Sequence, residues 1–236
     1  MSISAWQPVS SRTDTIYSRR NTTALLPLTR RSRWILLELA SLYFLVQMYI
    51  WRWQYTSAKS GVWLILLLLF ASHIWHRDTF RGVGFRFDNF FPAAKEACWA
   101  GIPLLLLLVL IGILSGRLWA IPMRWESTAS ALKYTLWGTF QQYGLQGYFH
   151  NRLSKVISQP LWSSSVNAIL FMSFHIPNPV LMISTLIGGF ACSMLFLQSR
   201  NLFVLGMFHG AIGLLLSNVF PREWLPNMRV GPGYFR

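Results

Sequence analysis

Acidic side chains are scarce in this chain, which has 7 Asp and Glu against 21 Lys and Arg. Charged residues make up only 12% of the 236 positions, about half the fraction that a soluble globular domain carries. Hydrophobic residues reach 53%, and 17 Phe and 12 Trp are among them. This composition predicts an integral membrane protein whose fold is an all-α transmembrane helix bundle.

Two further absences narrow the function. No nucleic-acid-binding motif accompanies the net charge of +14, and the basic residues flank apolar runs instead of forming one patch. The charge therefore indicates contact with lipid head groups, and we expect no nucleic acid partner. Cysteine is rare as well. Neither Cys98 nor Cys192 belongs to a CxxC pair, so both are expected to be reduced packing residues in apolar segments.

Long apolar runs predict about seven membrane spans. These are residues 34–51, 61–75, 93–114, 129–153, 162–175, 180–197 and 201–220, of which the second is short for a span. The organisation we expect is a basic N-terminal segment (1–33), two spans with a connector (34–92), a transmembrane core (93–220) and a polar C-terminal tail (221–236). No cleavable signal peptide is expected at the start, because a short apolar region with a small-residue cleavage site is missing.

The distribution of basic residues favours a cytoplasmic N-terminus. With seven spans and the N-terminus inside, 13 basic residues fall on the cytoplasmic side and the remaining 8 on the other. The cytoplasmic set consists of Arg12, Arg19, Arg20, Arg30, Arg31, Arg33, Arg77, Arg81, Arg86, Lys95, Arg152, Lys155 and Arg200. The same features are compatible with the cytoplasmic membrane of a bacterium.

The fourth expected span contains polar residues where a membrane helix usually has none. Gln142, Gln146 and His150 are spaced i, i+4 and i+8, so on an α-helix they form one stripe beside Gln141. Because unpartnered polar groups are costly inside a bilayer, this stripe should face the protein interior or a wet cavity. The later spans add His175 and His209, and we predict that all these segments converge on one intramembrane site.

Three segments carry a family resemblance: QQYGLQGYFHNRL at 141–153, FMSFHIPNP at 171–179 and GMFHGAIG at 206–213. In order and spacing they resemble the CPBP family of intramembrane proteases, which includes the CAAX prenyl endopeptidases and the bacterial Abi proteins. That family carries EExxxR, FxxxH and HxxxN on three membrane helices. Phe171 and His175 match the second motif, and His209 matches the histidine of the third. The resemblance implies a CPBP-like core and an intramembrane endopeptidase.

The chain departs from the family pattern at four motif positions. Gln141 and Gln142 replace the two glutamates, Gln146 replaces the arginine, and Gly213 stands where asparagine is common. In the family, the first glutamate and the FxxxH histidine are thought to activate water, while the later histidine and the asparagine hold the oxyanion. A carboxamide is not a general base near neutral pH. Since the acidic and the basic residues of the first motif are missing together, the substitutions remove the charges of the site as a set and leave no unpaired charge.

The residues leave three functions open. The first is an endopeptidase with altered chemistry, in which His175 acts with a histidine such as His150 or with Glu38 of the first span. The second is a non-catalytic relative that binds a transmembrane or lipidated peptide. The third is a small transporter or structural membrane protein, in which the glutamines are packing residues. Membrane lipids are the expected partners, no cofactor is indicated, a divalent metal is unsupported, and the oligomeric state is undetermined.

Overall fold

The computed structural model describes residues 29–117 and 125–236, with side chains from residue 129 onward in the second range. The expected basic N-terminal segment lies outside the described residues up to residue 28. Every regular element in the described ranges is helical. The α-helices are α2 (Arg30–Trp51), α3 (Gly61–Trp75), α4 (Phe80–Val83), α5 (Phe90–Leu114), α6 (Trp125–Gln142), α7 (Asn151–Val156), α8 (Pro160–Ser173), α9 (Pro179–Ser199) and α10 (Leu202–Val219). The remaining elements are the 3₁₀ helices η1 (Trp53–Tyr55), η2 (Ser57–Ser60) and η5 (Gly231–Phe235), and the π-helix η4 (Tyr143–His150).

The all-α membrane bundle predicted from composition is confirmed. Five helical segments are long and apolar enough to cross a membrane: Arg30–Tyr55, Ser57–Trp75, Phe90–Leu114, Pro179–Ser199 and Leu202–Val219. The second segment is longer than the sequence indicated, because η2 precedes α3 and adds a turn. The other two expected spans are helical too, as α6 to α7 and as α8, while the total of about seven stays a prediction.

Local sequence explains where the late helices begin. Asn178 caps α9, because its side-chain oxygen accepts a hydrogen bond from the Leu181 amide at 3.2 Å. Asn201 caps α10 in the same way through the Val204 amide at 3.1 Å. Each cap satisfies an amide that would otherwise lack a partner at the helix start. Pro179 follows the first cap, where its fixed φ suits a helix and its missing N–H is no loss.

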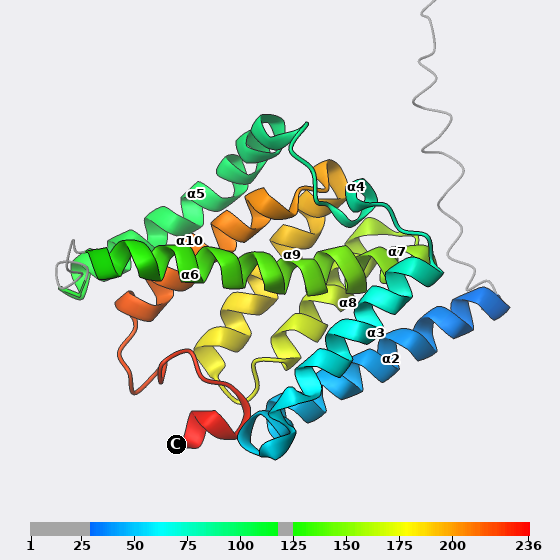
Figure 1. Cartoon of the computed structure of the whole chain (residues 1–236). Coiled ribbons are helices and arrows are strands. Elements are labelled where there is room, and N and C mark those ends of the chain that lie inside the picture. The colour runs from blue at the N-terminus through cyan, green and yellow to red at the C-terminus, as the bar shows by residue number, and fades with distance from the viewer. Residues whose placement is uncertain (1–28, 118–124) are drawn as a thin grey trace, which may run out of the picture.

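The polypeptide from α6 to α7 forms one continuous helical rod, which crosses in front of the later helices in Figure 1. Its central segment is the π-helix η4. We call α6, η4 and α7 together the glutamine helix. α6 packs on α10, α10 packs on α5, and α8 packs on α9, while α2 contacts both α3 and α7.

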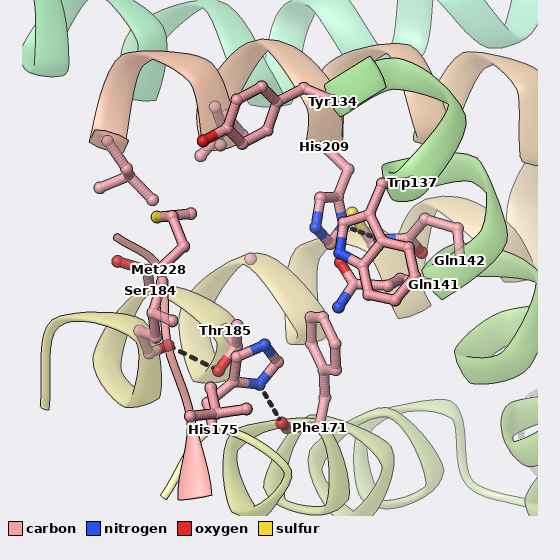
Figure 2. A pocket seen from close by; sticks show the side chains of 17 residues that line it. Tyr134, Trp137, Gln141, Gln142, Phe171, His175, Ser184, Thr185, His209 and Met228 are labelled. Atoms are coloured by element: carbon pink, nitrogen blue, oxygen red, sulfur yellow. Dashed lines mark hydrogen bonds between the residues drawn. The ribbon is translucent and has the colours of Figure 1, made fainter. Parts of the chain in front are cut away.

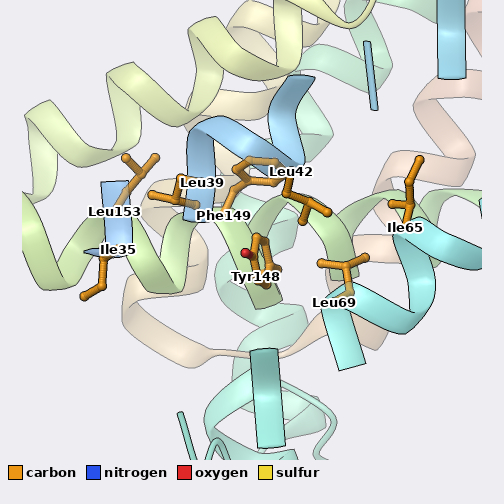
Figure 3. Packing of buried hydrophobic residues seen from close by; sticks show 8 residues of the cluster. All are labelled: Ile35, Leu39, Leu42, Ile65, Leu69, Tyr148, Phe149 and Leu153. Atoms are coloured by element: carbon orange, nitrogen blue, oxygen red, sulfur yellow. The ribbon is translucent and has the colours of Figure 1, made fainter. Parts of the chain in front are cut away.

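A buried apolar cluster joins the N-terminal hairpin to the second half of the glutamine helix (Figure 3). α2 contributes Ile35, Leu39 and Leu42, α3 contributes Ile65 and Leu69, and the glutamine helix contributes Tyr148, Phe149 and Leu153. Contact between these apolar side chains, and their removal from polar surroundings, hold α2 and α3 against the rest of the bundle. The cluster therefore fixes the position of the rod that carries the three glutamines.

Candidate functional site

Glycines on α10 bring the glutamine helix close enough to place its polar side chains against a histidine. A Cβ atom built on Gly206 would lie 2.0 Å from Thr139 Oγ1, and one on Gly210 would lie 2.7 Å from the Thr135 Cα atom. Only glycine permits this backbone approach, as in other membrane helix pairs with small residues at the interface. The close packing of α6 on α10 sets Gln142 beside His209.

Motif positions from three helices meet at one cavity of about 180 Å³ (Figure 2). The described residues that line it include Gln141, Gln142, Phe171, His175, His209 and Gly213. The ring of Phe171 lies between the two imidazoles, with its centroid 4.8 Å from that of His175 and 5.8 Å from that of His209. The convergence predicted from the sequence is therefore observed for these six positions.

Hydrogen bonds orient the two imidazoles differently. Nδ1 of His175 lies 2.8 Å from the Phe171 carbonyl oxygen, which can only accept, so Nδ1 carries the proton and Nε2 keeps a lone pair. Nδ1 of His209 accepts a hydrogen bond from Nε2 of Gln142 at 2.9 Å, so the proton of that ring sits on Nε2. Figure 2 shows this second nitrogen of His209 pointing away from Gln142. The cavity thus has one imidazole acceptor and one imidazole donor.

Gly213 stands at the motif position where asparagine is common, and its surroundings are tight. A Cβ atom there would lie 3.2 Å from Cδ1 of Tyr134, which also lines the cavity. An asparagine would need Tyr134 to move by a few tenths of an ångström or more. The Tyr134 ring therefore takes up part of the room that an asparagine side chain at this position would need.

Gln146 and His150 are buried but do not line this cavity. Both are 0% exposed, so the prediction that the stripe faces the interior agrees with the structure. Gln146 Oε1 accepts a hydrogen bond from Asn167 at 3.3 Å, and His150 Nε2 lies 3.4 Å from the hydroxyl oxygen of Ser164. Gln146 and His150 lie within the π-helix η4, whereas Gln142 ends α6. The wider turns of a π-helix change the register, so the two residues do not continue the face on which Gln142 lies. The single stripe is therefore divided between the cavity and a buried polar network.

Glu38 lies in a second polar region, away from the cavity. It belongs to a set of charged and polar residues that we call the charge cluster: Glu38, Ser72, His73, His76, Asp78, Tyr148, Arg152 and Lys155. Glu38 accepts hydrogen bonds from Ser72 and, at 2.8 Å, from the Tyr148 hydroxyl group. It also contacts His76 at 2.8 Å, and Nε of Arg152 lies 3.5 Å away. The carboxylate is thus engaged within the cluster and does not line the cavity.

Arg152 is the centre of the charge cluster and is 0% exposed. Its Nη2 lies 2.6 Å from Oδ2 of Asp78, and Lys155 approaches the other oxygen of Asp78 at 3.5 Å. Burial by itself raises the pKa of Asp78, but hydrogen bonds from Arg152 and His73 and the nearby positive charges outweigh it and lower that pKa to about 2. Burial lowers the pKa of Lys155, and the Arg152 charge adds to this effect.

Sequence reasoning missed several residues of both regions. Ser184, Thr185 and Cys192 of α9 line the cavity, as do Met228 and Val230 of the C-terminal tail. None of these residues has a motif signature. In the charge cluster, Tyr148 and Arg152 are spaced i, i+4 on a predicted helix, which is the one sequence signal that could have paired them.

Three described lining residues, His175, His209 and Cys192, are of types that ligate zinc, and a catalytic zinc site takes three protein ligands. Among the residues that the structure describes, no group of three or more His, Cys, Asp or Glu is arranged to hold an ion.

Comparison with protein families agrees with this geometry. Residues 124–215 match the family model described as type II CAAX prenyl endopeptidase Rce1-like. This match supports membership of the CPBP family. The matched segment contains all seven motif positions, from Gln141 to Gly213. Comparison with curated proteins and with solved structures finds no match. The chain is thus an integral membrane protein with a CAAX protease-like core.

Proposed function

We propose that this CPBP-family protein is a membrane receptor that holds a transmembrane or lipidated peptide in its cavity without hydrolysing it. The observation that carries this proposal is the chemistry of the cavity, where two carboxamides and two imidazoles stand and no Asp or Glu is among the described lining residues. A carboxamide accepts hydrogen bonds but does not take a proton from water near neutral pH. The base that the family uses is therefore missing.

What remains suits binding. Apolar side chains such as Leu181, Ile212 and Leu216 form much of the cavity wall and fit an apolar segment. The His209 Nε2–H group is a donor and the His175 Nε2 atom is an acceptor, so together they match the carbonyl and the amide of one peptide group. Because no net charge is buried in the cavity, an uncharged peptide segment can enter it without separating a charged side chain from its counter-ion.

A second candidate is an endopeptidase in which His175 acts as the base. The observation that favours it is the bond from His175 Nδ1 to the Phe171 carbonyl, which leaves Nε2 unprotonated toward the cavity. In this reaction Nε2 takes a proton from water, the hydroxide attacks the peptide carbonyl, and the proton passes to the leaving amine. The imidazolium intermediate would stand without a carboxylate partner, which disfavours this reading.

The test separates the two candidates with four proteins: wild type, His175→Ala, His209→Ala and Gln141→Glu. Each is immobilised in detergent and incubated with a library of transmembrane and C-terminal peptides, and retained and released species are identified by mass spectrometry. Leu110→Ala on the exposed side of α5 serves as the control. We expect wild type and control to retain intact peptides and His209→Ala to retain about tenfold less. Cleavage by wild type that disappears in His175→Ala would replace the receptor with the endopeptidase, and a wild type that neither retains nor cleaves any library peptide would overturn both.

We also propose that the protein lies in a bacterial cytoplasmic membrane with its N-terminus inside. The excess of basic residues on the N-terminal side of the first span supports this orientation. Reporter fusions at the two chain ends, one active only in the cytoplasm and one only outside, test it. A cytoplasmic reporter active at the C-terminus but silent at the N-terminus would contradict it.

A further inference from the structure

The C-terminal tail folds back over the cavity that holds the two histidines. Met228 and Val230 are among the residues that line this cavity, as is Ser184 of α9, and Figure 2 labels Met228 and Ser184 among the lining side chains. Figure 1 shows the chain end lying beside the connection between α2 and α3. We call residues 226–236 the C-terminal strap. Its position makes it part of the cavity wall although it lies outside the matched family segment.

The strap is attached to the loop that follows His175. The Gly231 amide donates a hydrogen bond to the Ile176 carbonyl oxygen at 2.8 Å. The Asn178 side-chain amide donates another to the Arg229 carbonyl oxygen at 3.1 Å. Val230 lies between these two bonds with an extended backbone, at φ −131° and ψ 167°. The loop therefore binds the strap as it would bind an extended peptide, because both hydrogen bonds reach backbone atoms of the strap and do not depend on the side chains of the strap.

A hinge precedes the attached part of the strap. Leu225 is 3% exposed and packs with Leu108, Leu181 and Leu216, so the chain is fixed up to this point. Asn227 and Met228 follow with φ of 49° and 57°. Asparagine adopts this left-handed region readily, whereas methionine rarely does. Movement about these two residues would release the strain at Met228 and leave Leu225 in place.

Two glycines fit the far part of the strap against α2 and η1. Gly231 has φ +56°, and a Cβ atom on it would lie 3.1 Å from Ile50 Cγ2. A Cβ atom on Gly233 would lie 2.3 Å from the Tyr55 hydroxyl oxygen. A larger side chain at Gly233 would therefore collide with the Tyr55 hydroxyl group, so that the strap or the Tyr55 ring has to move, without altering any residue that lines the cavity.

From these contacts we propose that the loop after His175 is a docking edge for an extended peptide, and that the C-terminal strap is its resident, displaceable occupant. The Ile176 carbonyl and the Asn178 side-chain amide bind the peptide backbone. When a partner peptide binds at this edge, the strap moves away from it by rotation about residues 226–228. This inference rests on the proposed peptide-binding function, and it adds the conformation of the ligand, the edge that binds it and the segment that competes with it.

A thiol beneath the strap tests whether the strap closes the cavity. Ser184→Cys, made with Cys98→Ser and Cys192→Ser, is the parent protein, and its reaction with a negatively charged maleimide is timed in detergent. Gly233→Leu removes the fit against Tyr55. Asn178→Asp keeps the oxygen that caps α9 but loses the donor to Arg229. Phe235→Ala, at a residue 73% exposed, is the control. We expect labelling to be about tenfold faster in Gly233→Leu and in Asn178→Asp than in the parent, and unchanged in Phe235→Ala.

A second measurement tests the docking edge. A fluorescent peptide with residues 227–236 of the strap, NMRVGPGYFR, is titrated onto the parent and onto Gly233→Leu, and its binding is followed by anisotropy. We expect the Gly233→Leu protein to bind it about tenfold more tightly, since the resident strap no longer competes. The same peptide with the amide nitrogen of the residue corresponding to Gly231 methylated lacks the donor to the Ile176 carbonyl oxygen, and it should bind to neither protein.

The outcomes separate this inference from the proposed function. Equal labelling rates in all four proteins would overturn the strap as an occupant, even if the cavity retained transmembrane peptides. Faster labelling without binding of the strap peptide would overturn the docking edge. Faster labelling with peptide binding supports the inference, and retention of no library peptide by wild type would then count against the proposed partner alone.

Discussion

The glutamine helix carries a neutral polar region near its middle and a charged one near its C-terminal end. Near its middle, Gln142 pairs with His209 in the cavity, and the described lining residues contain no acid. Ten residues further on, Arg152 is completely buried and contacts Asp78 and Glu38. The same rod in the same bundle therefore supports both arrangements.

The difference shows that the fold does not exclude buried charge. Arg152 is tolerated because two carboxylates, two imidazoles and two hydroxyl groups surround it within the charge cluster. Gln141, Gln142 and Gln146 occupy positions where family members carry both signs, and here both signs are absent together. A motif that kept only its acidic or only its basic residue would have a buried charge without a partner. Neutrality is thus a property of the cavity and not of the bundle.

The largest effect should follow removal of the central cation. Arg152→Met removes the closest cation of Asp78 and a further cationic contact of Glu38, both partly buried, so we expect a loss of about 3–5 kcal/mol in the free energy of unfolding. Thermal unfolding in detergent should show a fall in Tm of about 10 °C. The matched control is Arg81→Met, which breaks an exposed pair with Asp88 and should change stability by under about 1 kcal/mol. Equal effects of the two variants would contradict the comparison.

Placing a charge in the neutral region should be nearly as costly. Gln146 is 0% exposed and neighbours Asn167, so Gln146→Arg should destabilise the protein by about 2.5–3.5 kcal/mol. Gln146→Met controls for the change of side-chain shape. The double variant with Gln142→Glu should recover about 1–2 kcal/mol of the summed loss, because the two charges can pair. Strict additivity in the unfolding measurements would show that the two positions are not coupled.

Acid should weaken the charged end selectively. The folded pKa of Asp78 is about 2, below its ordinary value of 3.8, so its pairing contributes fully above about pH 4 and is lost as the pH falls toward 2. We expect wild type to lose about 1–2 kcal/mol more than Asp78→Asn between pH 5 and pH 2.5. Parallel Tm curves for the two proteins over this range would rule out the contribution of Asp78.

Sequence was sufficient for the helices and for the six motif positions at the cavity. Apolar runs and the capping residues Asn178 and Asn201 set most boundaries, because these signals are local. The π-helix η4 was not foreseen, since its register follows from packing against neighbouring helices. The pairing of Glu38 with Arg152 joins residues far apart in sequence, and nothing local indicates it.

The smallest effect should come from the neutral pair itself. Gln142→Met keeps the length of the side chain and removes the bond to His209, whose Nδ1 then lacks its donor. The amide oxygen of Gln142 has no partner among the described residues, so its removal offsets part of that loss. We expect a net cost of about 0.5–1 kcal/mol, no larger than that of Tyr43→Phe, which removes neutral bonds to Ser173 and Gln47, each at 2.9 Å. If Gln142→Met instead costs as much as Arg152→Met, the amide–imidazole pair stabilises the bundle as strongly as the ion pairs do, and the glutamines would be packing residues first and peptide-binding residues second.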